Sequence, residues 1–469
     1  MLAIAFDAHR LIAQLDTRLD SVLRHTKEAD HKGMLSVTLA VPELASLELT
    51  ELPRGGIYWA RLEDQSFRFA MGQEALIQAS GRTRFQQLEE EFSRLCQSWV
   101  KLDPDNLSAP ARAFVGFSFS PKAKLHSCWQ GFANACILVP SLLLERKGHS
   151  CQLTFTCNTL TGPDRDEIRR GWLRQALNLF VEVTGFSMPY DSLKPLDRIE
   201  DTPSESEWLA RVHKVLKAIE EGHLEKVVLT RRVRVRSHQP LRPARSLSWL
   251  SSRHSSGVQL AYASAHATLV GASPERLVSL QGDKVICDAV AGTACRHPLA
   301  DQDRKLGLAL LADNKARHEQ DLVVNSIIQS LDPLCTSLSA PVEPQLLKSS
   351  KIQHLWSPIH GRVRSEISLL DLASKLHPTP AVGGTPCQQA VTWLEEHESG
   401  QRGWYTGALG WMATDGSGEL AVILRCALLR HNVADLFAGA GIVGDSNPED
   451  ELAETEWKLR TMLDALAVV

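Results

Sequence analysis

The segment GVQLAYASAHATLVGASPERLVSLQGDKVICDAVAG, residues 257–292, contains four apolar runs separated by short turns. The runs are rich in Val, Leu, Ile and Ala, and each has the length of an ordinary strand. They cover 257–265, 267–273, 276–282 and 284–292. Because strands joined by such short turns run antiparallel, the segment predicts an antiparallel sheet.

Working outward, the same pattern predicts strands before and after this segment, with helices placed between groups of strands. Strand-like segments are 55–62, 67–72, 111–120, 135–146, 226–236, 403–413, 418–430 and 433–444, and helical segments are 1–20, 83–101, 163–184, 301–331 and the C-terminal stretch from Asn447. A further helix, with a capping box predicted at Thr202–Glu205, is expected to stop at Gly222. Runs of strands followed by helices favour an α+β fold with mostly antiparallel sheet.

The overall composition is typical of a globular protein with a full core. The 469 residues carry a net charge of −4, with 43% hydrophobic and 23% charged residues. This balance indicates neither a nucleic-acid-binding surface nor a membrane-binding one. Ten scattered cysteines without C-x-x-C spacing are expected to be reduced thiols in a cytoplasmic protein. The Pro-, Ser- and Asp-rich stretch 187–207 is the best candidate for an internal boundary.

The C-terminal segment GDSNPEDELAETEWKL, residues 444–459, concentrates acidic side chains on a predicted helix. Asn447 is suited to cap this helix, and Glu451, Glu454 and Lys458 share one of its faces. One interpretation is a solvated face with a Glu454–Lys458 pair. The other is one side of a metal site, completed by Glu319, which projects from the apolar stripe of the 301–331 helix. Glu319 could equally belong to a buried salt bridge with Lys315 or a neighbour of Arg317.

A glycine-rich run at residues 439–444, GAGIVG, matches the G-x-G-x-x-G pattern of dinucleotide-binding proteins. That fingerprint requires a second strand after a helix, and too few residues follow for a complete unit. The run therefore gives little support to a nicotinamide oxidoreductase. The glycines are expected to bring backbone N–H groups close to an anion.

A series of short blocks resembles the chorismate-utilising enzymes. In order they are EKVVLTR (225–231), LVGASPERLV (269–278), AGTACR (291–296), KARHEQDLV (315–323), LHPTPAVGGTP (376–386), RGWYTGALGW (402–411), LRCALL (424–429), FAGAGIV (437–443) and ETEWKL (454–459). The resemblance implies a single large fold with antiparallel sheets packed face to face and helices outside. It places the catalytic region at 201–469 and leaves 1–200 as an N-terminal half without a matched motif.

Within that family, the chain is most similar to isochorismate synthases, which convert chorismate reversibly to isochorismate. The resemblance implies that Lys226 activates water for addition at ring carbon C2. It makes Glu275 the general acid that protonates the leaving C4 hydroxyl. A lysine must lose its proton to act as a base. Because burial lowers the pKa of a lysine, Lys226 is expected to be partly buried.

The resemblance also assigns the remaining site residues. Glu319 and Glu454 match ligands of Mg²⁺, and Glu451 matches a nearby acid that binds through water. Residues expected to contact the substrate are Gly292, Thr293, His377, Ala381, Arg425, Gly439 and Lys458. No glutaminase subunit is expected, and a monomer is compatible with the sequence.

Several alternatives stay open at this point. Relatives that aminate chorismate usually carry glutamine in place of Lys226, so the lysine argues for water as the nucleophile. Salicylate synthases keep the lysine but tend to have threonine in place of Ala381, so the alanine favours stopping at isochorismate. A non-catalytic protein that binds a carboxylate metabolite would be expected to lack Lys226 or Glu275. The product could feed salicylate, siderophore or menaquinone synthesis.

Overall fold

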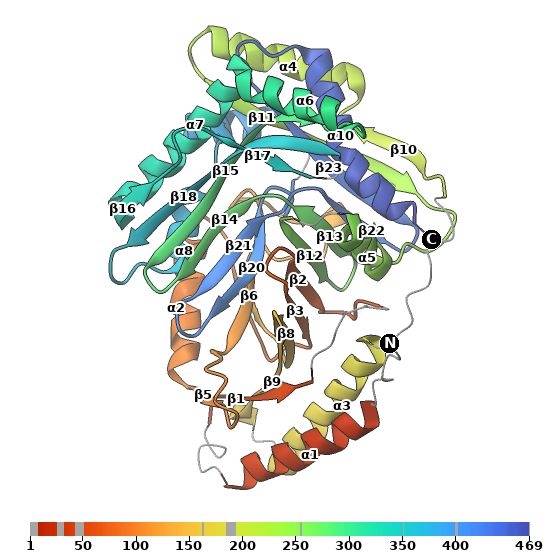
Figure 1. The fold of residues 1–469 in the computed structure, drawn as a ribbon, viewed down its shortest axis with the longest axis vertical. Helices are drawn as coiled ribbons and strands as arrows, with labels where there is room; N and C mark the ends of the chain where they lie inside the picture. The colour runs from red at the N-terminus through yellow and green to blue at the C-terminus, as the bar shows by residue number, and fades with distance from the viewer. Residues whose placement is uncertain are drawn as a thin grey trace.

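The computed structural model describes residues 8–25, 32–42, 51–161, 164–183, 194–253, 256–349, 351–398 and 402–468. These residues form two large β-sheets, stacked face to face in the middle of the molecule with helices on the outside (Figure 1). The fold is α+β, as predicted. Among the described residues, the one parallel pair of strands joins β1 to β5, and no helix is both long and apolar enough to cross a bilayer.

The larger sheet has 13 strands drawn from the whole length of the chain. In spatial order its strands are β10 (Asp197–Thr202), β11 (Lys226–Arg236), β23 (Val433–Ile442), β22 (Cys426–Arg430), β13 (Thr268–Ser273), β12 (Val258–Ala263), β2 (Ile57–Arg61), β3 (Ser66–Met71), β8 (Leu142–Lys147), β9 (Ser150–Asn158), β1 (Met34–Val41) and β5 (Trp99–Leu102), with β19 (Gly384–Thr385) paired to β11. The N-terminal and C-terminal halves meet where β2 pairs with β12.

The second sheet has ten strands and is also built from both halves. Its order is β16 (Cys335–Ser339), β18 (Ile352–Val363), β15 (Lys284–Cys295), β14 (Arg276–Gln281), β21 (Gly418–Val422), β20 (Ala408–Ala413), β6 (Arg112–Phe117), β7 (Ala135–Val139) and β4 (Ala75–Ala79), with β17 (Gln345–Lys348) paired to β18. Apolar residues from both sheets fill the space between them and form the largest core cluster.

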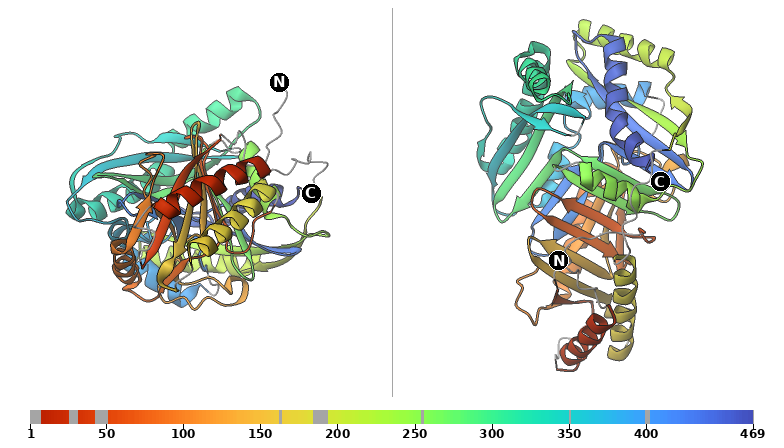
Figure 2. Two further views of the ribbon diagram at one scale, coloured as in Figure 1. Left: turned by 90° about the horizontal axis from the view of Figure 1, so that it is seen from below. Right: turned by 45° about the vertical axis from the view of Figure 1, so that its right-hand side comes forward.

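Helices cover the outer faces of both sheets. They are α1 (Ala8–His25), α2 (Arg84–Gln97), α3 (Arg165–Val183), α4 (Glu205–Glu220), α5 (Pro243–Arg253), α6 (Ala300–Ala312), α7 (Asn314–Leu331), α8 (Leu369–Leu376), α9 (Cys387–His397) and α10 (Pro448–Leu466). Helices α1, α3, α5 and α10 pack against the larger sheet through a second apolar cluster. Figure 2 shows α1 beside α3 at one end of the molecule, and α10 runs toward α4 at the other.

Three predictions about helices were wrong in detail. The segment 301–331 is two helices, because the Asp313 side chain accepts a hydrogen bond from the Ala316 backbone N–H and caps a new helix. The expected helix at 83–101 ends at Gln97, and the chain continues as β5. The capping box before α4 is formed by Ser204 and Glu207, not by Thr202 and Glu205.

The predicted strand 418–430 was also wrong, in a way that matters for the site. It is two strands in different sheets, β21 and β22, and the chain crosses from one sheet to the other at residues 423–425. A second crossover, at Pro274 and Glu275, leads from β13 to β14. Side chains at the two crossovers therefore lie between the sheets.

Candidate active site

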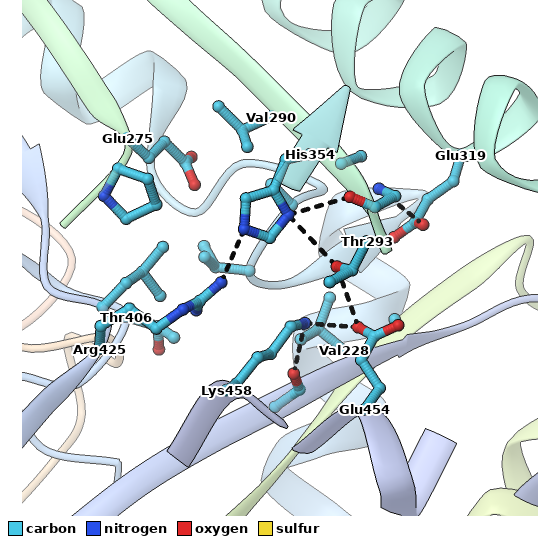
Figure 3. A pocket seen from close by; sticks show the side chains of 18 of the residues that line it. Val228, Glu275, Val290, Thr293, Glu319, His354, Thr406, Arg425, Glu454 and Lys458 are labelled. Atoms are coloured by element: carbon cyan, nitrogen blue, oxygen red, sulfur yellow. Dashed lines mark hydrogen bonds and ion pairs between the residues drawn. The ribbon is translucent and has the colours of Figure 1, made fainter. Parts of the chain in front are cut away.

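A cavity lies between the two sheets and is lined by residues of both sheets and of helices α7 and α10. Nine of the twelve predicted site residues line it: Glu275, Gly292, Thr293, Glu319, Ala381, Arg425, Gly439, Glu454 and Lys458. Figure 3 shows Glu275 and Arg425 at one end, and Glu319 and Glu454 at the other. The remaining three, Lys226, Glu451 and His377, lie behind the cavity wall.

The two crossovers between the sheets supply Glu275 and Arg425. Arg425 adopts a left-handed backbone conformation with φ of +46°, which is costly for a residue with a side chain. The conformation is held because Arg425 joins β21 in one sheet to β22 in the other. Strain of this kind is common where a side chain must be aimed into a site.

Glu275 is almost completely buried, with 3% of its surface exposed. Burial, followed by repulsion from Asp288, raises the pKa of Glu275 to about 8. The nearby cations Lys226 and Arg425 act in the opposite direction but do not outweigh these effects. Glu275 therefore carries a proton at neutral pH, as a general acid must.

Lys226 is the first residue of β11 and is 0% exposed. Its Nζ lies 2.7 Å from Glu319 Oε1. Burial alone would raise the pKa of Glu319, but Lys226 and then Lys458 hold it below its ordinary value. Glu319 therefore belongs to a buried salt bridge, but the predicted partner was wrong: it is Lys226, and Lys315 pairs with Glu451 instead. Glu319 also faces the cavity, so the salt bridge and the metal interpretation are compatible.

Gly441 explains why glycines occur in the 439–444 run. A Cβ on Gly441 would lie 2.6 Å from Glu319 Oε1 and 2.8 Å from Lys226 Cε. Only glycine leaves room for this ion pair against β23. Gly439 meets a charged side chain through its backbone carbonyl, not through an N–H group as expected. The carbonyl accepts a hydrogen bond from Lys458 Nζ at 2.9 Å.

Replacing Gly441 with alanine is expected to lower kcat by about 100-fold or more, because the added methyl group displaces Lys226 and Glu319 by a large fraction of an ångström. Gly444→Ala is a matched control, since its added Cβ would meet no atom closer than 3.8 Å. Steady-state kinetics of both variants, with melting temperatures, check this. Equal activity in the two variants would contradict the packing argument.

Gly292 forms a β-bulge in β15 that contacts both Glu319 and His354. Its φ is +63°, and the register of β15 against β18 shifts at this point. Its N–H donates to Glu319 Oε2 at 3.2 Å, and its carbonyl lies 3.0 Å from His354 Nδ1. The bulge therefore fixes Glu319 and His354 together.

His354 is the histidine that lines the cavity, and the sequence did not single it out. Arg425 Nη2 lies 3.0 Å from His354 Nε2 and can only donate, so Nε2 accepts and Nδ1 carries the hydrogen toward Gly292. Burial, with Arg425 and Lys458 nearby, lowers the pKa of His354 well below its ordinary value. His354 is therefore neutral and holds the Arg425 side chain in place.

His377, the predicted active-site histidine, is buried beside the site and does not line it. Its Nε2 lies 2.8 Å from the Thr406 carbonyl oxygen. Its ring packs edge-on against Phe117 and Phe119. Burial, followed by Arg84, lowers the pKa of His377 to about 3. His377 thus supports Thr406, which does line the cavity.

The C-terminal helix α10 contributes Glu454 and Lys458 to the cavity, so its acidic face is not simply solvated. Their side chains form an ion pair at 2.6 Å, and Asn447 caps the helix as predicted. Glu451 is buried, and its Oε1 accepts hydrogen bonds from Lys315 and Ser446, both at 2.7 Å. Burial, then the neighbouring Glu454, raises the pKa of Glu451.

The chain belongs to the chorismate binding enzyme family, whose sequence profile matches residues 20–467. It is 33% identical to the salicylate biosynthesis isochorismate synthase of Pseudomonas aeruginosa, over 88% of this chain and 85% of that protein. It is 30% identical to the isochorismate synthase MenF of Bacillus subtilis, over 95% of this chain and 96% of that protein. The structure of the menaquinone-specific isochorismate synthase MenF from Escherichia coli superposes with a TM-score of 0.76 and 25% identity, covering 96% of this chain and 99% of that one.

Proposed function

We propose that the protein is an isochorismate synthase, an isomerase that interconverts chorismate and isochorismate. The observation that carries the proposal is a buried, protonated Glu275 in the cavity wall, with Glu319 in the same wall paired to the buried Lys226 behind it. Isochorismate synthases among the relatives that span most of both chains support it. The product would supply salicylate or menaquinone synthesis, as the names of the Pseudomonas aeruginosa and Escherichia coli proteins suggest, or siderophore synthesis.

In the proposed reaction, a water molecule loses a proton to Lys226 and bonds to ring carbon C2. The two ring double bonds each shift by one position, and the C4–O bond breaks. The departing hydroxide takes the proton of Glu275 and leaves as water. Every forward turnover therefore leaves Lys226 with one extra proton and Glu275 without one, and solvent must restore both.

The substrate is a dicarboxylate, so the site must supply positive charge. Arg425 lines the cavity, held by His354, and its planar guanidinium suits two-point contact with a carboxylate. Lys458 is anchored by Glu454 and the Gly439 carbonyl. Gly292, Thr293 and Ala381 form part of the wall that would contact the ring. Following the resemblance described above, the small Ala381 side chain supports stopping at isochorismate.

The donor set of the cavity fits Mg²⁺. Glu319 and Glu454 come from different helices, α7 and α10, and both carboxylates face the same cavity. Mg²⁺ is commonly held by one or two carboxylates, with the remaining positions filled by water and substrate oxygens. The Glu451 carboxylate accepts hydrogen bonds from Lys315 and Ser446 and does not line the cavity. When bound, the ion would neutralise one substrate carboxylate.

Glu454→Gln is expected to weaken Mg²⁺ binding by more than about 10–100-fold. That range is typical when a residue that only supports a metal ligand is replaced, and Glu454 is proposed to be a ligand itself. Turnover should fall in parallel, since a neutral amide is a poor ligand for a hard cation. Calorimetric titration with Mg²⁺, and activity in excess chelator, provide the measurements. Full activity of the wild type in chelator would contradict a metal requirement.

The reversibility of the reaction provides the test of the proposed function. Incubation with Mg²⁺ and either chorismate or isochorismate should give the same mixture of the two compounds. A protein that only binds these metabolites would leave both unchanged.

The ten cysteines, all free in the structure, support the proposed cytoplasmic location.

A further inference from the structure

A second, smaller cavity adjoins the reaction cavity. The two cavities share three lining residues, Pro274, His354 and Arg425. Pro274 immediately precedes Glu275, the proposed general acid. The wall between the cavities therefore stands next to the group that would protonate the leaving hydroxyl.

This wall contains two polar side chains, those of His354 and Arg425. The hydrogen bond from Arg425 Nη2 to His354 Nε2, 3.0 Å long, joins two of its three residues. His354 is held from its other side by the Gly292 carbonyl. A small movement of the Arg425 side chain would therefore connect the two cavities.

The second cavity extends to residues that are partly exposed. Its residues Ser256, Leu347 and Ser349 are half-buried, whereas Thr461 is almost completely buried. Three of its lining residues carry hydroxyl groups: Ser256, Ser349 and Thr461. These hydroxyl groups offer hydrogen-bonding partners to a water molecule, and Ala272, Pro274 and Leu347 make the rest of the lining apolar.

We propose that the second cavity is the water path serving ring carbon C4. This inference rests on the proposed function, in which each turnover takes up one water at C2 and releases another at C4. The substrate ring would fill the reaction cavity and separate these two waters. The water released beside Glu275 would leave past Arg425 and Pro274, and the same path would return water to C4 in the reverse reaction.

Two variants narrow this path without touching the reaction cavity. Thr461→Leu and Ala272→Leu each enlarge a side chain that lines only the second cavity, from different elements, α10 and β13. Thr461→Ser is the matched control, because it keeps the hydroxyl group and makes the side chain smaller. Melting temperatures of all three establish that they are folded.

Oxygen exchange at chemical equilibrium tests the proposal. The enzyme is placed with Mg²⁺ and an equilibrium mixture of chorismate and isochorismate in ¹⁸O-water. The hydroxyl of chorismate is at C4 and that of isochorismate is at C2, so the mass of each compound reports one position. Interchange of the two pools is measured separately with ¹³C-labelled chorismate.

In the wild type and in Thr461→Ser, ¹⁸O should enter both compounds as fast as carbon label exchanges between them. In the two leucine variants, water trapped at C4 should return before it mixes with solvent. Entry of ¹⁸O into chorismate should then lag several-fold behind carbon exchange, while entry into isochorismate keeps pace. Equal entry at both positions in both leucine variants would overturn the proposal. No carbon exchange in the wild type would instead refute the proposed function.

Discussion

Lys226→Gln is expected to abolish detectable conversion of chorismate while leaving chorismate binding intact. Glutamine has a similar length and polarity but cannot accept a proton, so water would no longer be activated. Loss of a positioned base typically costs about 10²–10⁴-fold. The lysine is 0% exposed and does not line the cavity, so its removal should disturb the substrate little.

Turnover and chorismate affinity must be measured together for this variant, by steady-state kinetics and calorimetry. The melting temperature serves as a control, because the substitution leaves the buried carboxylate of Glu319 without its partner at 2.7 Å. If Lys226→Gln still forms isochorismate at a rate near that of the wild type, Lys226 is not the base.

Glu275→Gln is expected to lower the rate by at least about 10²–10⁴-fold in both directions of the reaction. Hydroxide is a poor leaving group unless protonated, and glutamine has no proton to give. In reverse, the same carboxylate must deprotonate the water that attacks C4. Equal losses from chorismate and from isochorismate, with unchanged chorismate affinity, would support the role. A loss confined to affinity would make Glu275 a binding residue instead.

The raised pKa of Glu275 also predicts a pH dependence. Lys226 is a cation in its ion pair with Glu319, and Glu275 is protonated below its pKa of about 8, so the two residues together must lose one proton before the forward reaction. kcat/KM for chorismate should therefore rise as the pH approaches 8. The profile for isochorismate should run in parallel. The forward reaction needs neutral Lys226 and protonated Glu275, and the reverse needs the opposite arrangement, so both states carry the same number of protons. The residual activity of Glu275→Gln should lack this rise.

Local patterns predicted the parts of the fold that local interactions determine. The alternating segment 226–236 is a strand that begins at Lys226, as expected, and Asn447 caps α10 through the Glu449 and Asp450 N–H groups. The acidic face of α10 was less clear from sequence. Whether it is solvated or faces a cavity depends on what packs against it, and that information lies in other segments.

Features that depend on distant pairing were not predicted. The strand expected at 418–430 is continuous by hydrophobicity, yet it changes sheet at Arg425. His354 meets Thr293 only through the register of β18 against β15, and a period-2 pattern does not specify which strand is the partner. The sequence offered one signal for His354, namely a histidine among apolar residues in the stretch IQHLW, 352–356. The family motif directed attention to His377 instead.

Identification of the product formed from chorismate tests the central claim most directly. The protein should be incubated with chorismate and Mg²⁺ in the presence of ammonium ions, and the mixture followed by NMR until its composition is constant. The account predicts isochorismate in equilibrium with chorismate, without salicylate, pyruvate or an aminated ring. Accumulation of salicylate with pyruvate, or of an aminated product, would contradict it.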